Sequence, residues 1–277
     1  MSTTPGSHAA PVVPVPPPKR EIRIFSHSTL FYWWPVWFFG FIMFAITYFD
    51  GSRMVVVPKA TKAENEREVA GRKRSVYILP EGINIPANPE TKEPDEPHIR
   101  MAKSAKLGVI FCTVLLLIIF ISNVPLRGLW SLLTIMFIVL LVVIIALFEW
   151  WEKLIAELSL IDIRINAGGY FFISFILFVI WVLTIFVFDR RTYVAVTPGQ
   201  VRMCLAVGAG ETVYDTIGMT FQKKQDDLFR HWIVGLGSGD LIMHRAGTKE
   251  EIDMPNVLFI GAKIKEIEQM IKEKEVV

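Results

Sequence analysis

The side chains that could carry out chemistry are sparse and scattered along this chain. It has five histidines in 277 residues, and only His231 and His244 share one predicted domain. Two histidines without a nearby cysteine or carboxylate make a poor zinc site, so we expect no metal and no cofactor. The run Gly235-x-Gly237-x-Gly239 lies between two expected strands, which favours a hairpin turn over a dinucleotide loop. Hydrolase, metalloprotease and phosphate-loop motifs do not occur, so we expect no catalytic residue and no enzyme.

Two groups of basic residues are the candidate contacts to lipid headgroups or to a partner protein. They are Arg72, Lys73 and Arg74, and Lys223, Lys224 and Arg230. Anionic headgroups attract clusters of this kind. The alternative is a solvated charged surface, and Asp226 and Asp227 lie among the second group. The formal net charge is only +2, so nothing indicates a nucleic-acid partner.

Four long apolar segments account for a hydrophobic content of 52%. They cover residues 29–49, 107–126, 129–149 and 170–188, and the one charged residue in them is the terminal Glu149. About 20 helical residues span about 30 Å, the thickness of the hydrocarbon core. We therefore predict a multi-pass protein of the cell membrane with four transmembrane helices within residues 29–189.

Aromatic residues gather near the ends of these segments and predict an interfacial belt at the headgroup level. They are Trp33, Trp34, Trp37, Trp130, Trp150, Trp151 and Tyr170. Four spans place both termini on one side of the membrane. The Lys and Arg residues near the spans do not decide which side this is. We expect both termini in the cytoplasm because of the C-terminal domain described below.

The remaining parts of the first two-thirds of the chain are polar. Residues 1–28 are predicted to be a disordered Pro-rich tail, with six prolines in the first 20 residues. Within the polar loop 50–106, we expect a short helix over residues 60–74 and a strand over residues 76–79. Between the last two segments, residues 151–161 show a helical apolar face and residues 161–165 alternate like a strand, so both interpretations stay open.

The composition changes at residue 190, where short strand-like runs replace the apolar segments. Expected strands cover residues 192–196, 201–206, 211–219, 231–236, 240–245 and 250–254. A closing helix carries Ile260, Ile264, Ile267 and Ile271 on one face. This pattern predicts an α+β domain over residues 190–277, in which antiparallel strands are capped by one C-terminal helix.

Three short motifs of this domain carry a resemblance to a known family. They are Tyr193-Val194-Ala195-Val196-Thr197 leading to Val201, then Gly237-Ser238-Gly239-Asp240-Leu241-Ile242, then Pro255-Asn256-Val257. In type and order they resemble the bacterial pleckstrin-homology-like domains found beside membrane spans, over residues 190–274. The chain departs from the family at Thr197-Pro198-Gly199-Gln200, where many relatives carry Asn and a basic pair, so a charged first hairpin is in doubt. The resemblance implies a fold more than a function.

These observations favour a non-enzymatic, membrane-anchored interaction or scaffold protein. The bilayer and a protein partner, or a second copy of the chain, are its expected partners. The alternative is an accessory subunit of a membrane transport or secretion complex. In that case other subunits supply the polar pathway, because the polar groups inside these spans are mainly hydroxyls that bond within or between helices.

Overall fold

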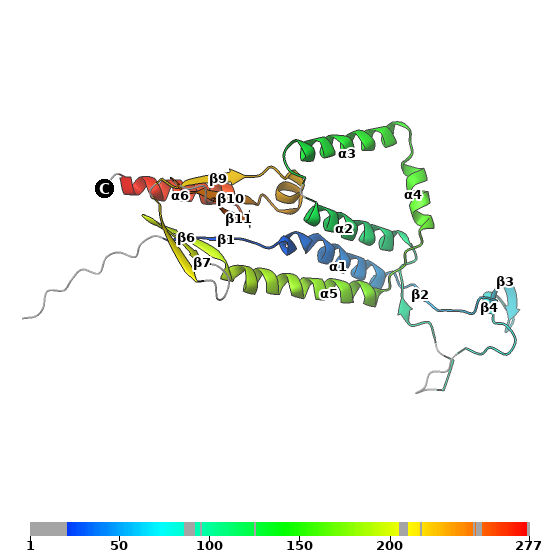
Figure 1. Ribbon diagram of the computed structural model, residues 1–277. Helices are drawn as coiled ribbons and strands as arrows, with labels where there is room; N and C mark the ends of the chain where they lie inside the picture. The colour runs from blue at the N-terminus through cyan, green and yellow to red at the C-terminus, as the bar shows by residue number, and fades with distance from the viewer. Residues whose placement is uncertain are drawn as a thin grey trace, which may run out of the picture. The chain divides into compact units, whose positions relative to one another are not determined.

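The chain separates into two units (Figure 1). The structure is a computed structural model that describes residues 21–85, 92–94, 96–124, 126–204, 210–216, 218–245, 247 and 251–275. The helical unit consists of Ser28–Phe186 and Asp226–Gly235. The strand unit consists of Met1–His27, Val187–Gln225 and Leu236–Val277. The chain therefore passes between the two units four times, rather than once near residue 190 as the composition predicted.

Four helices of the chain are long and apolar enough to cross a membrane, with mean hydropathies of 1.6 to 3.0. The first combines η1 (Thr29–Trp33) and α1 (Trp34–Phe49). The next two are α2 (Lys106–Asn123) and α3 (Leu129–Leu147). The last is α5 (Ala167–Leu183), which continues into η2 (Thr184–Phe188) and η3 (Asp189–Arg191). The four predicted segments are confirmed as helices, and the fourth is longer at both ends.

Helices α1, α2 and α5 pack together in the helical unit (Figure 1). A Cβ atom at Gly40 would collide with Oγ of Ser174 and lie 3.0 Å from the ring of Phe111. The missing side chain therefore permits the close approach of α1 to α5. Beside this contact, the Trp37 ring lies 5.0 Å from that of Phe178, between centroids, in an edge-to-face pair.

Two residues of the predicted aromatic belt pack between helices. Trp37 packs edge-to-face on Phe178 and on Trp181 of α5. Tyr170 is 1% exposed and packs edge-to-face on Phe111. Trp37 therefore fills the contact between α1 and α5, and Tyr170 fills the contact between α5 and α2. Trp130, by contrast, is 72% exposed, as a residue at the headgroup level would be.

Helix α3 differs from the other three long helices in its surroundings. Of its described residues only Ser131 is buried. All its leucines and valines and Ile138 are exposed, and its other isoleucines are half-buried. Water would be a poor solvent for this helix, and hydrocarbon or another apolar helix would be a good one.

The loop between α1 and α2 contains two small antiparallel ladders. In the first, β2 (Arg53–Met54) pairs with β5 (Ile99–Arg100). In the second, β3 (Lys62–Val69) pairs with β4 (Arg72–Ile78). The predicted helix over residues 60–74 is therefore wrong. The hairpin turn explains the difference, since Ala70 and Gly71 both have positive φ, as a tight two-residue turn requires. The Pro-rich part of this loop, residues 80–97, was expected to be extended, and residues 86–91 and 95 of it lie outside the described residues.

Between α3 and α5 the helical pattern prevails. Helix α4 (Trp151–Leu160) forms as one of the two interpretations predicted. Residues 161–165 form no strand, and only Asn166 makes an isolated bridge, to Met101. The side chain of Asn166 instead accepts a hydrogen bond of 2.6 Å from the backbone N–H of Gly169 and caps α5.

The strand unit contains two antiparallel sheets and a C-terminal helix. The first sheet has the order β1 (Ile22–Phe25), β6 (Tyr193–Thr197), β7 (Gln200–Cys204) and β8 (Glu211–Asp215). The second has the order β11 (Glu251–Val257), β10 (Gly239–His244) and β9 (Thr220–Lys224). Helix α6 (Ile260–Glu275) follows the last strand. The expected strand-rich region with a closing helix is confirmed.

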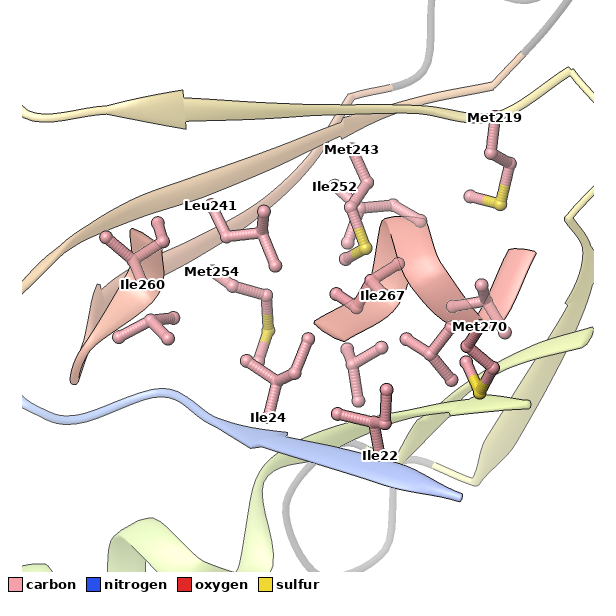
Figure 2. Packing of buried hydrophobic residues seen from close by; sticks show 14 residues of the cluster. Ile22, Ile24, Met219, Leu241, Met243, Ile252, Met254, Ile260, Ile267 and Met270 are labelled. Atoms are coloured by element: carbon pink, nitrogen blue, oxygen red, sulfur yellow. The ribbon is translucent and has the colours of Figure 1, made fainter. Parts of the chain in front are cut away.

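The two sheets and α6 enclose one apolar core (Figure 2). Ile260 and Ile267 of α6 are fully buried, and Ile264 and Ile271 pack at the edge of the cluster. They meet Leu241 and other side chains from both sheets. The predicted apolar stripe of the helix is thus the face that closes the core.

Strand β1 corrects the prediction that residues 1–28 form a disordered tail. Ile22 pairs with Val196 and Ile24 pairs with Val194, and both isoleucines are at most 3% exposed. The alternation of buried Ile22 and Ile24 with exposed Arg23 is that of a strand with one face on a core. Residues 1–20 lie outside the described residues.

Two further corrections concern the segment between β8 and β10. Residues 220–224 form β9, which the sequence did not predict, since the expected strand ended at residue 219. Residues 231–236 were expected to be a strand, but η4 (Phe229–Val234) is a short helix. The side chain of Asp227 accepts a hydrogen bond from the backbone N–H of Arg230, which favours a helical turn over an extended chain.

The substitution Ile24→Ala tests whether β1 belongs to the strand unit. It removes a buried side chain, so we expect a loss of about 2–5 kcal/mol in the stability of this unit. Hydrogen exchange at the amides of Val194 and Val196 measures it, because these residues lie in the partner strand. Arg23→Ala is the matched control on the solvent face and should leave exchange nearly unchanged. Equal protection in Ile24→Ala and the unaltered protein would contradict the assignment.

Candidate functional site

The ten residues Asp226–Gly235, here called the anchor segment, join β9 to β10 and yet belong to the helical unit. The backbone carbonyl of Asp226 accepts hydrogen bonds from the N–H of Gly128, at 3.0 Å, and from Oγ of Ser131, at 3.3 Å. At its other end, the carbonyl of Val234 accepts a bond of 2.9 Å from the indole N–H of Trp34. The anchor segment therefore holds the start of α1 and the start of α3.

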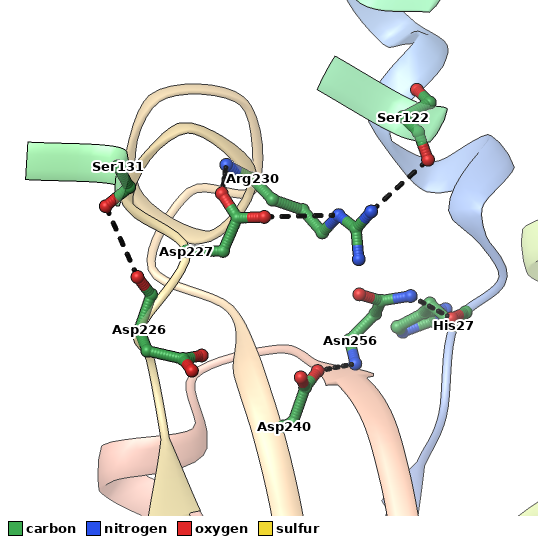
Figure 3. A network of polar contacts seen from close by, with 8 residues as sticks. All are labelled: His27, Ser122, Ser131, Asp226, Asp227, Arg230, Asp240 and Asn256. Carbon is green, nitrogen blue, oxygen red and sulfur yellow. Dashed lines mark hydrogen bonds and ion pairs between the residues drawn. The ribbon is translucent and has the colours of Figure 1, made fainter. Parts of the chain in front are cut away.

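Arg230 lies at the centre of the anchor segment (Figure 3). Its guanidinium donates a hydrogen bond of 3.2 Å to the backbone carbonyl of Ser122, near the end of α2. Nε of Arg230 lies 3.8 Å from Oδ2 of Asp227, and the two side chains are 13% and 3% exposed. A carbonyl at a helix end has no partner within its own helix, so Arg230 satisfies a group that would otherwise be unpaired.

A second polar network lies within the strand unit (Figure 3). The backbone N–H of Asn256 donates to Oδ1 of Asp240, at 3.0 Å, and its side-chain amide donates to the carbonyl of His27, at 2.8 Å. Asn256 has a φ of 57°, a left-handed conformation that asparagine tolerates better than most residues. His27 in turn lies 3.2 Å from Asp189, between Nδ1 and Oδ2. This network fixes the end of the N-terminal segment to the second sheet.

The six basic residues predicted as contacts do not form one site. Arg72, Lys73 and Arg74 lie together on exposed β4, where Nζ of Lys73 is 3.2 Å from Oε2 of Glu66. Lys223 and Lys224 are neighbours on β9, so their side chains point to opposite faces. Arg230 belongs to the other unit and is mostly buried. The lysine pair and the exposed triplet remain candidate contacts, whereas Arg230 has a role in packing.

The described residues offer little for catalysis. They contain no group of three His, Cys, Asp or Glu side chains that could hold a metal ion. His231 is buried in the anchor segment, and His244 lies on β10, 3.6 Å from Glu251. The glycine run after η4 leads from a short helix into a strand, the reverse of the order in a dinucleotide-binding loop.

Tyr193 and Cys204 face one another across β6 and β7. The hydrogen bond between the two side chains raises the pKa of Tyr193 above its ordinary value. The charge of the Cys204 thiolate and desolvation act in the same direction. The guanidinium carbon of Arg23 lies 5.4 Å from the centre of the Tyr193 ring. The phenol therefore acts as a hydrogen-bonding group on the surface of this sheet.

An apolar cavity of about 520 Å³ lies in the loop between α1 and α2. Its walls come from the extended chain after β2, from the end of β4 and from the chain before β5. They include Val55, Val57, Tyr77, Leu79, Ile83 and Pro97. The sequence reasoning missed this cavity, although the loop contains apolar runs at residues 55–57 and 76–79 and the isoleucines Ile83 and Ile85.

Comparisons with known proteins add no relationship to these observations. No family model matches the chain, and no curated protein and no solved structure matches it. Any function must therefore be argued from the residues and their geometry.

The substitution Arg230→Met tests the role of the anchor segment. It leaves the Ser122 carbonyl without its side-chain donor and the charge of Asp227 without its ion-pair partner, so we expect a loss of about 1–3 kcal/mol in stability. Thermal unfolding of the full chain in detergent or nanodiscs provides the measurement. Lys223→Met is the matched control, because that lysine is exposed on β9.

A double variant distinguishes the ion pair from general packing. The double variant combines Asp227→Asn with Arg230→Met. Asparagine keeps an oxygen that can accept the hydrogen bond from the backbone N–H of residue 230, and it removes the carboxylate charge that Arg230→Met alone would leave unpaired. The double variant should then lose less stability than the sum of the two single variants. Strict additivity would show that the two side chains do not act together.

Proposed function

We propose that this chain is a non-enzymatic, multi-pass protein of the cell membrane that presents a pleckstrin-homology-like domain at the membrane surface. Its domain binds a protein partner or a second copy of the chain. Both termini, and with them the domain, lie on the cytoplasmic side.

The observation that carries this proposal is the way the chain passes between the two units. The first strand of the domain precedes the first long helix, and the next strand follows the last. The anchor segment adds a second excursion into the helical unit. A domain connected to four apolar helices at four points stays close to the membrane that surrounds those helices. Tethering raises its effective concentration toward other membrane-bound molecules, so weak contacts suffice for association.

The strand unit supports the choice of domain class. It has a four-stranded and a three-stranded antiparallel sheet, followed by one helix that closes the core. Antiparallel strands capped by one C-terminal helix are what the pleckstrin-homology-like resemblance over residues 190–274 implies, whereas β1 comes from outside that range. The Pro255-Asn256-Val257 motif lies where the left-handed Asn256 links the second sheet to the N-terminal segment. The short hairpin between β6 and β7 carries no basic residue, so inositol phosphate recognition at this loop is not part of the proposal.

One observation favours a second candidate, the accessory subunit of a transport or secretion complex. Helix α3 is buried only at Ser131 among its described residues. Helices of other subunits could pack along its length without displacing anything in this chain. Since Thr134 and Ala146 are the only small residues on its described surface, and small residues usually allow close helix approach, lipid remains the better match.

Photo-crosslinking in living cells separates the two candidates. A photoreactive residue at Val213, which is 52% exposed on the outer strand β8, samples the domain. The same residue at Leu140, which is 57% exposed on α3, samples the membrane. We expect a discrete protein adduct or a crosslinked dimer from Val213 only. Adducts from Leu140 alone would favour the accessory subunit, and adducts from neither position would contradict both.

Thiol labelling tests the side on which the domain lies. In a chain with Cys112 and Cys204 replaced by Ser, single cysteines are introduced at Ser75 of β4 and at Thr212 of β8, both exposed. A reagent that does not cross the membrane should label Ser75→Cys in intact cells, and Thr212→Cys only after permeabilisation. The opposite pattern would reverse the orientation. Equal labelling of both positions in intact cells would contradict a membrane-spanning arrangement.

A further inference from the structure

Two arginines face each other at the end of the first long helix. Arg53 and Arg100 are direct partners in the ladder of β2 and β5. Like charges directly opposite one another in a ladder are unfavourable. Among the described residues, neither guanidinium is paired with a carboxylate: Arg53 donates to the carbonyl of Pro97, at 3.1 Å, and Arg100 to that of Tyr48, at 3.2 Å. Each guanidinium has five N–H donors, so most of them remain available to an anion.

The pair lies beside the last turn of α1. The guanidinium carbon of Arg100 lies 3.9 Å from the centre of the Tyr48 ring, a cation–π contact. Tyr48 is the second-last residue of α1. If α1 spans the bilayer, as proposed above, its last turn lies at the level of the phosphate groups. Both arginines are exposed there.

The apolar cavity of the same loop adjoins the pair. Pro97, whose carbonyl accepts the hydrogen bond from Arg53, also lines the cavity. Val55 and Val57, also in its walls, follow Arg53 by two and four residues along extended chain. The volume of about 520 Å³ lies within the 300–1,000 Å³ typical of sites for small ligands. Few polar groups line it, so a sugar or nucleotide would leave most of its polar atoms unpaired.

A cationic end beside an apolar cavity matches an anionic amphiphile in both charge and polarity. We propose that this loop binds an anionic phospholipid of the bilayer. Its phosphate lies between Arg53 and Arg100, and one acyl chain occupies the cavity. The phosphate relieves the repulsion between the two arginines, and the chain covers exposed apolar side chains such as Val56, which is 80% exposed.

Binding to the purified full-length chain in a neutral detergent tests the inference. The probes are short-chain phosphatidylglycerol, short-chain phosphatidylcholine and inorganic phosphate. We expect the unaltered chain to bind phosphatidylglycerol about tenfold or more tightly than phosphatidylcholine, because both lipids carry the phosphate but the choline ammonium of the second brings a positive charge close to the two arginines. Arg53→Gln should lose that preference. Equal affinity for the two lipids, or an unchanged preference in Arg53→Gln, would overturn the inference.

Arg67→Gln is the matched control. Arg67 also opposes an arginine, Arg74, across a ladder of the same loop, but its guanidinium lies 3.5 Å from Glu64. The substitution changes the charge by the same amount and should leave lipid binding unchanged. A loss as large as that of Arg53→Gln would show a diffuse effect of loop charge and would overturn the site.

Val56→Asn tests the acyl chain separately from the phosphate. It places a polar group in the cavity at an exposed position, so the fold should tolerate it. We expect weaker binding of phosphatidylglycerol and unchanged binding of inorganic phosphate. Complete displacement of the lipid by inorganic phosphate, together with normal binding of phosphatidylglycerol to Val56→Asn, would overturn the acyl-chain part of the inference. The site would then bind the phosphate group alone. These measurements need no protein partner, so their failure leaves the proposed function standing, and a failure of crosslinking leaves the lipid site standing.

Discussion

The ladder between β1 and β6 is the constraint on which the rest of the arrangement depends. It pairs residues that precede the first long helix with residues that follow the last one. The main part of the helical unit, Ser28–Phe186, is therefore a closed excursion between two adjacent strands of one sheet. Buried Ile22 and Ile24 hold this ladder to the core, because separating the strands would expose both side chains to water. The anchor segment is a second, shorter excursion of the same kind, between the neighbouring strands β9 and β10 of the other sheet.

The sequence was most informative where one physical effect dominates. Long uncharged runs have few alternatives to spanning helices, and Ile260, Ile264, Ile267 and Ile271 could share only one helical face. Prediction failed where the partner was distant or the run was short. Four residues of β1 carry too little pattern to stand out from a Pro-rich tail. The hairpin in loop 50–106 depends on the positive φ of Ala70 and Gly71. A helix was predicted there because the residues around this turn have a high helix propensity.

The candidate sites also divide into those that adjacent residues reveal and those that depend on contacts between distant residues. Runs of basic residues are visible in a sequence, and Arg72–Arg74 are indeed adjacent and exposed. Arg230 is basic too, and Asp227 lies close to it in the chain, but its bond to the Ser122 carbonyl of α2 joins residues far apart in the sequence, so its packing role was not predictable. The pair of Arg53 and Arg100 depends on a contact between residues nearly 50 positions apart. Only the register of a short ladder brings those two charges together.

The split origin of the first sheet also sets an order of events during synthesis. Ile24 and its partner Val194 are separated by 194 − 24 = 170 residues. At about 5–20 residues per second, β1 leaves the ribosome about 10–30 s before its partner exists. During that interval the edge of β1 and its isoleucines have no native neighbour. Strand β1 can pair with β6 only after the last long helix has been synthesised. The strand unit therefore folds completely only in chains in which all four long helices have been translated.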